Sequence, residues 1–288
     1  MKNNPDKTDL ETLARQCGAR HIPFHSSTKA HWQSPPALQA IEAQLTQALH
    51  LRSVLLLTGA NGVGKSALVG RWLEGLDTRR YLTLVVTQAT LSGSSLLSLL
   101  THKLGKSPSG RRDRNLQRIE EALTELEQQT PLIVLDEAQH YSCAALEEVR
   151  LLLGLNLATQ PVFALTMISD DYFLKTLGMR HHRALYSRIA YHLSLQPWSR
   201  KTIDAYLTQS LKTAGLGHFD IEPAAVDLLA SASAGLPRCL SQLARTAWIH
   251  TVQQSATTLS PDHVQEAMKT IPYLPGNQLP PIPPTEEP

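Results

Sequence analysis

The fold of this 288-residue chain is decided by the stretch Gly59-Ala60-Asn61-Gly62-Val63-Gly64-Lys65-Ser66, which matches the spacing G-x-x-x-x-G-K-[ST] in full. An apolar run precedes this stretch, and apolar residues at helical spacing follow it. The pattern therefore predicts a strand, then a loop, then a helix. Glycines let such a loop turn its amide groups towards phosphate oxygens, and the helix N-terminus adds about half a positive charge. We expect residues 59–67, ending at Ala67, to bind a nucleotide, with Lys65 on its β- and γ-phosphates and Ser66 on magnesium.

An acidic pair follows a second apolar run. Residues 131–135 are typical of a buried strand, and Asp136 and Glu137 come directly after it. A carboxylate at that position holds Mg²⁺ directly or through water, which predicts this role for Asp136. Glu137 is then the predicted general base for an attacking water. A solvated turn is the alternative, and the place of the pair, about seventy residues after the loop at the end of an apolar strand, argues against it. The Asp-Glu pair itself favours an ATPase over a small-molecule kinase. No Asn-Lys-x-Asp motif follows, which argues against a GTPase.

The pattern between residues 51 and 197 alternates apolar runs with amphipathic stretches. Five runs are typical of strands: 54–58, 82–87, 132–135, 162–168 and 189–195. Four of them are almost continuously apolar, as parallel strands covered on both faces are. Residues 51–197 are therefore predicted to form an α/β domain, a P-loop NTPase αβα sandwich with a five-stranded parallel sheet.

The remaining segments are predicted to be smaller. Residues 1–50 form an N-terminal extension and linker with one helix, which starts at two prolines. Residues 198–271 form an all-helical lid domain, with helices at 199–214, 222–232, 237–253 and 261–269 and no further strand. Residues 272–288 are rich in proline and are predicted to be a disordered tail.

Composition excludes several classes of protein. With 42% hydrophobic residues, 18% charged residues and a net charge of +2, the chain is neither disordered nor membranous. No run reaches the roughly 18 apolar residues of a spanning helix, and the N-terminus lacks a signal-peptide core, so we expect a cytoplasmic protein. Cys17, Cys143 and Cys239 are far apart, and His181-His182 lacks a zinc-binding pattern. We therefore expect reduced thiols and no metal site beyond the Mg²⁺ of the nucleotide.

Arginines outside the loop are further candidates. Arg238 ends Gly-Leu-Pro-Arg (235–238) at the start of a predicted lid helix, where it either reports the state of the γ-phosphate or is a surface residue. Arg183 and Arg188 lie just before the fifth predicted strand. Either one serves as an arginine finger towards a neighbouring subunit, or both form surface salt bridges.

Taken together, these residues resemble the AAA+ ATPases grouped with ExeA and with the transposition regulators TniB, TnsC and MuB. The resemblance covers about residues 20–270. Its motifs, in order, are Ile-Pro-Phe (22–24), the loop at 59–66, Leu-Asp-Glu-Ala-Gln-His (135–140), Leu-Glu-Glu-Val-Arg-Leu-Leu (146–152), Ser-Arg-Ile-Ala-Tyr-His-Leu (187–193) and Gly-Leu-Pro-Arg (235–238). The loop and the Asp-Glu-Ala-Gln-His stretch are its most specific parts.

The resemblance implies roles for individual residues. Arg188 would be the arginine finger and Arg238 the second-sensor arginine, while Ile22 and Phe24 would flank the adenine. Ser169 falls at the first sensor, the polar residue that ends the fourth strand. Many relatives have Gly-Gln-Pro-Glu where this chain has Ile-Ser-Asp-Asp (168–171), a departure consistent with weak or partner-dependent hydrolysis.

The transposition branch implies an ATP-dependent homo-oligomer, a ring or a helical filament, that binds duplex DNA and recruits or activates a transposase. One segment fits this expectation. Between residues 103 and 118, six cations face one acid, Asp113, for a charge of 6 − 1 = +5: Lys103, Lys106, Arg111, Arg112, Arg114 and Arg118. Part of this basic segment is predicted as a loop that follows phosphates without reading bases, although a solvated loop is equally open.

Two other functions remain open. The secretion branch, typified by ExeA, normally adds a spanning helix and a cell-wall-binding domain, and the sequence contains neither. A signalling or defence ATPase would dock a partner on the helical domain or on the tail, where residues 279–284 suit an extended docking peptide. We favour the transposition branch, with ATP and Mg²⁺ as cofactors.

Overall fold

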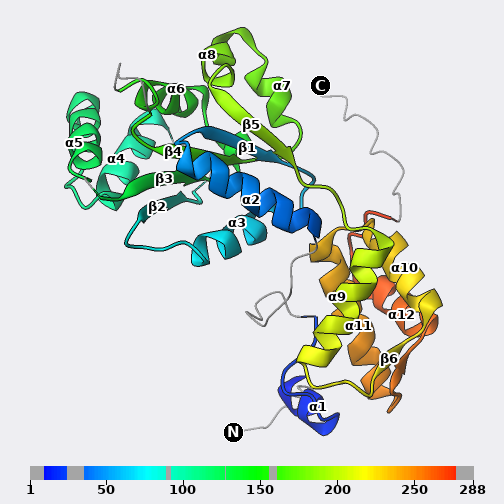
Figure 1. Ribbon diagram of the computed structural model, residues 1–288. Helices are drawn as coiled ribbons and strands as arrows, with labels where there is room; N and C mark the ends of the chain where they lie inside the picture. Colours follow the sequence, from blue (N-terminus) through cyan, green and yellow to red (C-terminus); the bar gives the residue numbers. More distant parts are fainter. Residues whose placement is uncertain (1–9, 25–35, 89–91, 127, 156–160, 277–288) are drawn as a thin grey trace, which may run out of the picture. The chain divides into compact units, whose positions relative to one another are not determined.

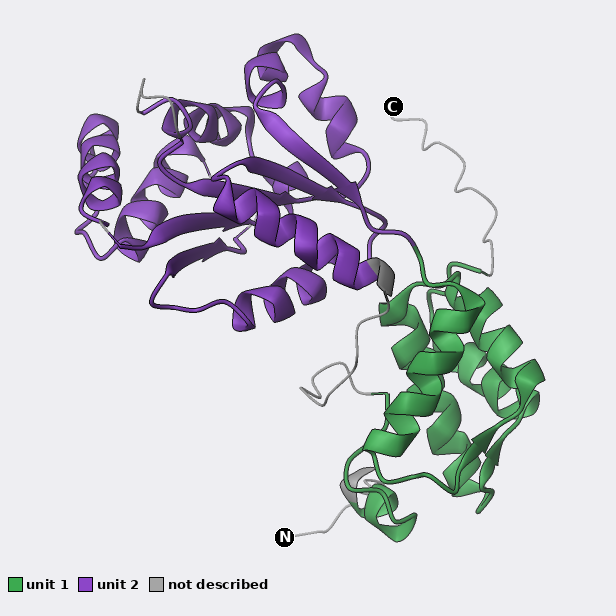
Figure 2. Ribbon diagram, in the orientation of Figure 1, with its two compact units in different colours: residues 1–35, 197–288 green, residues 36–196 purple. Residues whose placement is uncertain are grey.

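The computed structural model describes residues 10–24, 36–88, 92–126, 128–155 and 161–276 (Figure 1). The chain divides into two compact units, which Figure 2 colours separately. We call residues 36–196 the sheet unit, and residues 1–35 with 197–288 the helical unit. The first 50 residues, predicted as one extension, are thus divided between the two units. The boundaries predicted for the four domains stay predictions, and residues 277–288 of the predicted tail lie outside the described residues.

The predicted five-stranded parallel sheet is confirmed, with strand order β2-β3-β4-β1-β5. Its strands are β1 (Val54–Thr58), β2 (Tyr81–Val86), β3 (Thr130–Leu135), β4 (Ala164–Ile168) and β5 (Ile189–Ser194). Every pairing between them is parallel. The carboxyl ends of β1, β3 and β4 therefore meet at one edge of the sheet, where ligands of such folds bind.

Both faces of the sheet are covered by helices. Alternate strand residues such as Val54 and Leu56 join a core that includes residues of α4 (Gly93–Lys103), α5 (Arg112–Thr124) and α6 (Cys143–Leu152). α2 (Pro36–His50) contacts β1, β4 and β5 and lies across one face of the sheet in Figure 1. α3 (Lys65–Glu74) packs on α2, where the Trp72 indole donates a hydrogen bond of 2.9 Å to Thr46. Because β1 is fully buried, it reads as a continuous apolar run.

Short elements connect β3, β4 and β5. η1 (Ala138–His140) precedes α6, and α7 (Phe173–Leu177), η2 (Arg180–His182) and α8 (Arg183–Tyr186) lie between β4 and β5. Figure 1 shows α7 and α8 beside the end of the sheet that carries β5. α6 contacts both η2 and α8, so the segment before β5 is held against α6.

The helical unit contains the four predicted helices and more. They are α9 (Arg200–Thr213), α10 (Pro223–Ser233), α11 (Pro237–Gln253) and α12 (Pro261–Thr270), joined by α1 (Leu10–Gln16). The Ser199 hydroxyl caps α9 by accepting a hydrogen bond of 3.3 Å from the Thr202 amide. The prediction that strands end before this unit was wrong: β6 (Asp220–Ile221) pairs with β7 (Thr258–Leu259). Two-residue strands are too short to show the alternation from which a strand is predicted. Within the described ranges, no helix is long and apolar enough to cross a membrane.

Candidate nucleotide-binding site

The loop at residues 59–66 joins β1 to α3 at the carboxyl edge of the sheet. Gly59 has φ +152°, and a Cβ added there would lie 2.6 Å from the carbonyl oxygen of Leu195. Gly64 caps α3 with a left-handed φ of +101°. Side chains at these two positions would clash with the backbone or strain it, so glycine is what permits the loop to turn into the helix.

Lys65 is buried beneath this loop. Its Nζ donates hydrogen bonds to the carbonyl oxygens of Gly59 at 2.7 Å and Ala60 at 3.2 Å. Burial lowers the pKa of Lys65, and the negative charges of four carboxylates oppose that shift: Glu137, Asp171, Asp170 and Asp136. The lysine of the loop is thus surrounded by acids that follow β3 and β4.

Ser66 and Asp136 come together across the sheet edge although 70 residues separate them. The Ser66 hydroxyl donates a hydrogen bond of 3.0 Å to Asp136 Oδ1. The same oxygen accepts from the Glu137 amide at 2.9 Å. A hydroxyl beside a carboxylate is a pair of hard oxygen donors of the kind that Mg²⁺ prefers, so the residues present fit the predicted ion.

Glu137 is held in an uncommon conformation. Its φ of +52° places a residue other than glycine in the left-handed region, a strain that recurs at functional sites. The side chain of Gln139 makes two hydrogen bonds. Its Nε2 donates to Glu137 Oε2 at 2.6 Å, and its Oε1 accepts from the main-chain amide of Asp170 at 3.3 Å. Gln139 therefore joins the carboxylate to the end of β4. The sequence analysis assigned it no role, although it lies in the motif at 135–140.

Ser169 ends β4 at the same edge and is fully buried. Its amide donates to the Leu57 carbonyl at 3.0 Å, and its hydroxyl donates to the Asp170 carbonyl at 3.1 Å. The hydroxyl is thus engaged with the backbone. The first-sensor role of Ser169 stays a prediction.

The predicted finger lies on the surface of the sheet unit. Arg188 is exposed, and its guanidinium donates to the Ala184 carbonyl at 2.7 Å. Arg183, in α8, is exposed as well. Across the residues that the structure describes, no hydrogen bond or ion pair joins Arg188 to the loop at 59–66, so its role stays a prediction that depends on a second subunit.

Three other predicted residues belong to the helical unit. Arg238 is the exposed second residue of α11. Ile22 is half-buried, and the buried Phe24 donates its amide to the Ser210 hydroxyl at 2.8 Å, with its ring 6.5 Å from that of Tyr206. Phe24 is thus anchored on α9. The predicted roles of these residues at the adenine and the γ-phosphate stay predictions.

The basic segment is less positive in the folded protein than in the sequence. Three of its six cations form ion pairs: Lys106 with Glu125 at 2.7 Å, Arg111 with Asp113 at 2.7 Å, and Arg112 with Glu148 at 2.5 Å. Two of these acids lie beyond residues 103–118, so the local charge becomes 6 − 3 = +3. Lys103 and Arg114 are exposed and have no ion pair in the described chain.

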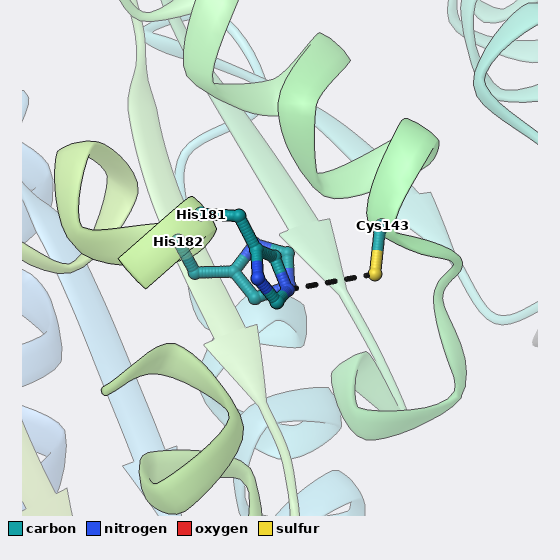
Figure 3. Close-up of side chains that lie close together, drawn as sticks. All are labelled: Cys143, His181 and His182. Carbon is teal, nitrogen blue, oxygen red and sulfur yellow. Dashed lines mark hydrogen bonds between the residues drawn. The ribbon is translucent and has the colours of Figure 1, made fainter. Parts of the chain in front are cut away.

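A cluster that the sequence analysis missed lies on α6 and η2. Cys143, the first residue of α6, comes next to His181 and His182, with Sγ 3.7 Å from Nε2 of His181 (Figure 3). Burial, and then the neighbouring His181, lower the pKa of His182. The sequence analysis looked for metal ligands at short spacing along the chain. Cys143 and His181 are 38 residues apart, so they form no such pattern.

Comparisons with known proteins agree with this geometry. Residues 48–177 match the model of an AAA domain. General secretion pathway protein A of Aeromonas hydrophila is 25% identical over 201 residues, which make up 68% of this chain but only 36% of that protein. The chain thus spans about a third of the length of this relative.

Solved structures share the fold. The ORC1 protein of Aeropyrum pernix in complex with DNA has a TM-score of 0.62 at 19% identity, covering 85% of this chain and 68% of that one. Drosophila ORC bound to DNA has a TM-score of 0.61 at 17% identity, and the match covers 93% of this chain and 67% of that one. The RuvB Holliday junction branch migration motor of Thermotoga maritima has a TM-score of 0.53 at 18% identity, covering 80% and 68%. Such identities establish the fold alone. The chain therefore shares the P-loop NTPase-like α/β fold of these structures, and its residues 48–177 match the model of an AAA domain.

Proposed function

We propose that the sheet unit binds ATP with Mg²⁺ and hydrolyses it. The observation that carries this proposal is the hydrogen bond of 3.0 Å between Ser66 and Asp136, beside the buried Lys65. Charged phosphate oxygens would replace the neutral Gly59 and Ala60 carbonyls as hydrogen-bond acceptors for Lys65. Ser66 and Asp136 would hold the ion, whose charge offsets that of the β- and γ-phosphates.

The chain supplies a base for the attacking water. Glu137 would accept its proton, since a carboxylate that follows a buried strand can reach the γ-phosphate side of the loop. Gln139, bound to Glu137 Oε2 at 2.6 Å, would orient that carboxylate and couple it to the end of β4. The test is direct: purified protein should bind ATP in the presence of Mg²⁺ and release phosphate. No affinity for adenine nucleotides would refute the proposal.

We further propose that the protein works as an ATP-dependent homo-oligomer on duplex DNA and recruits or activates a transposase. Support comes from the motif resemblance, from the exposed Lys103 and Arg114, and from the fold shared with proteins solved on DNA. Binding through phosphates alone would be independent of sequence and steeply dependent on salt.

Assembly on DNA tests this second proposal. A non-hydrolysable ATP analogue should promote oligomers on duplex DNA of arbitrary sequence. Lys65→Ala should abolish them, whereas Glu137→Gln should preserve or prolong them. Absence of DNA binding at low salt with ATP would refute the DNA role and leave the ATPase proposal intact.

Arg188 offers a separate test of the oligomer. As a finger acting on a neighbouring subunit, it should matter only in the assembled state, where such arginines contribute about 10³–10⁵ in rate. Arg188→Ala should then reduce turnover in the oligomer and leave the dilute monomer unchanged. An equal loss in both states would contradict a finger in trans.

The secretion function is the second candidate, and the 25% identity to General secretion pathway protein A favours it. On that alternative the ATPase would act in the assembly of a secretion apparatus and would have no affinity for duplex DNA. The same binding measurement at low salt therefore separates the two functions.

A further inference from the structure

A sulfur and two imidazoles meet where α6 begins. Cys143 opens that helix, and His181 and His182 end η2, which packs on it. One ligand atom of each residue lies within 4.8 Å of the other two, and Figure 3 shows the rings and the thiol turned towards one another. The cluster belongs to the sheet unit and shares no residue with the phosphate-binding edge.

The spacing suits a small tetrahedral ion. Zinc binds sulfur at about 2.3 Å and imidazole nitrogen at about 2.0–2.1 Å, which places the two ligand atoms about 3.5 Å apart. The separation of Cys143 Sγ from His181 Nε2 is 3.7 Å. Rotations of these side chains would bring the remaining ligand atoms, now within 4.8 Å, to the same spacing.

The burial of His182 is an independent indication of a ligand. This histidine is 4% exposed, and its Nε2 is buried without a hydrogen-bond partner among the described residues. Buried polar atoms in native proteins almost always have a partner, and an ion is one of the explanations for an exception. Coordination of an ion by one ring nitrogen of His182 would fix the orientation of the ring and provide the missing partner.

Neighbouring charges define the rest of the site. Glu147 lies one turn after Cys143 on α6, and its charge acts on His182. Both Glu147 oxygens already accept hydrogen bonds from Arg150, at 2.8 and 2.6 Å. Glu147 and a Cys143 thiolate together supply two negative charges for a divalent cation, but Glu147 is engaged with Arg150 and lies outside the group of three ligand atoms. The fourth position therefore falls to water.

We propose that Cys143, His181 and His182 bind a divalent ion of the zinc class, with a water molecule as the fourth ligand. One thiolate with two imidazoles is a donor set that selects zinc over Mg²⁺. The ion would fasten η2 to α6. Because η2 continues through α8 to Arg188, it would also fix the segment that carries the predicted finger.

The experiment is metal binding by the full chain under reducing conditions. Wild-type protein should bind about one equivalent of Zn²⁺, with a melting temperature raised by about 5 °C at a hundredfold excess over Kd. In Cys143→Ser/His181→Ala, two exposed ligands are lost and affinity should fall more than about a hundredfold. Co²⁺ should give a thiolate charge-transfer band in the wild type and none in Cys143→Ser.

Control variants locate the site. Cys17→Ser and His140→Ala remove a thiol and an imidazole outside the cluster and should keep wild-type affinity for Zn²⁺. Glu147→Gln should keep the ion as well, because both of its oxygens are bound to Arg150. The proposal is overturned if the wild type binds no Zn²⁺ at micromolar concentration, or if Cys143→Ser/His181→Ala binds it as tightly as the wild type. Folding of each variant is checked by circular dichroism, and the use of exposed ligands avoids a substitution of the buried His182.

Discussion

The carboxyl edge of the sheet, around Lys65, Asp136 and Glu137, and the basic segment both concentrate charge, but they neutralise it differently. At the edge, Lys65 is buried, bound to main-chain carbonyls, and faced by carboxylates from the ends of two other strands. In the basic segment, two of the three paired cations lie against exposed carboxylates, such as Lys106 against Glu125 at 2.7 Å, and only Arg112 reaches a buried one, Glu148. The edge keeps charges close without letting them pair fully.

The difference separates a candidate site from a charged surface. Exposed ion pairs contribute about 0–1 kcal/mol and give little information on function. Charges of both signs held together in a partly buried edge are costly unless a ligand completes them. A high density of charge along the sequence is therefore a weaker indication of a binding site than the burial of the charged Lys65. The predictions below test this contrast, from the largest expected effect to the smallest.

Removal of the predicted base should give the largest effect. Glu137→Gln keeps the size of the side chain but cannot accept a proton, so kcat should fall by about 10²–10⁴. The Kd for ATP should change little, because Glu137 is not expected to hold the nucleotide. Phosphate release and nucleotide titration measure the two quantities, with the exposed Glu120→Gln as the matched control. An unchanged kcat would remove Glu137 from the mechanism.

Lys65→Ala should act on affinity. A hydrogen bond to a charged group contributes about 1.5–3 kcal/mol, so the Kd for MgATP should rise by about 10- to 100-fold. Lys212→Ala, at an exposed position of α9, serves as the control and should bind ATP normally. Equal affinities of Lys65→Ala and the wild type would show that the buried ammonium does not contact phosphate.

Gln139→Ala tests whether the bridge from Glu137 to Asp170 positions the base. Loss of this orienting contact should lower kcat about tenfold and leave KM within about twofold, since misplacement affects the reacting geometry and not substrate binding. A residue with a purely structural role would lower the melting temperature instead. Gln209→Ala on α9, an exposed position, is the control. A change confined to KM would contradict the positioning role.

The basic segment should give a smaller effect, confined to DNA. Lys103→Gln/Arg114→Gln removes the two exposed cations of the basic segment that have no ion pair with described residues. If both contact phosphates, the slope of log affinity against log salt should become shallower by about 1.8, at 0.9 for each contact. Affinity for ATP should be unchanged. An unaltered slope would indicate that this segment is only a solvated surface.

Arg112→Gln should differ from its neighbours by affecting stability. Its guanidinium makes two hydrogen bonds, of 2.5 and 2.8 Å, to Glu148, a residue that is 8% exposed. With screening at the half-exposed arginine, the loss should be about 1 kcal/mol, or about 2 °C in melting temperature. Arg114→Gln should leave thermal unfolding unchanged. Equal melting temperatures would place Arg112 with the dispensable surface charges.

The sequence alone specified the strand, loop and helix around residues 59–66, and the chemistry of that loop stays a prediction. β1 is buried on both faces, so its apolar run and the glycines after it specify strand, loop and helix locally. The acids after β3 could be placed beside the loop because parallel strands end at one edge. No such local rule exists for β6 and β7, which are two residues long and pair residues far apart in the sequence, such as Asp220 with Thr258.

Tertiary structure decided which side chains act together. The pairing of Arg112 with Glu148, the bridge from Gln139 to Asp170 and the meeting of Cys143 with His181 join residues that are 36, 31 and 38 positions apart. Sequence spacing carries information over one helical turn or one strand, because backbone geometry fixes neighbours only at that range. Beyond that range, and outside the motifs that place Asp136 beside Ser66, the packing of helices on the sheet selects the partners, and only the folded chain reveals them.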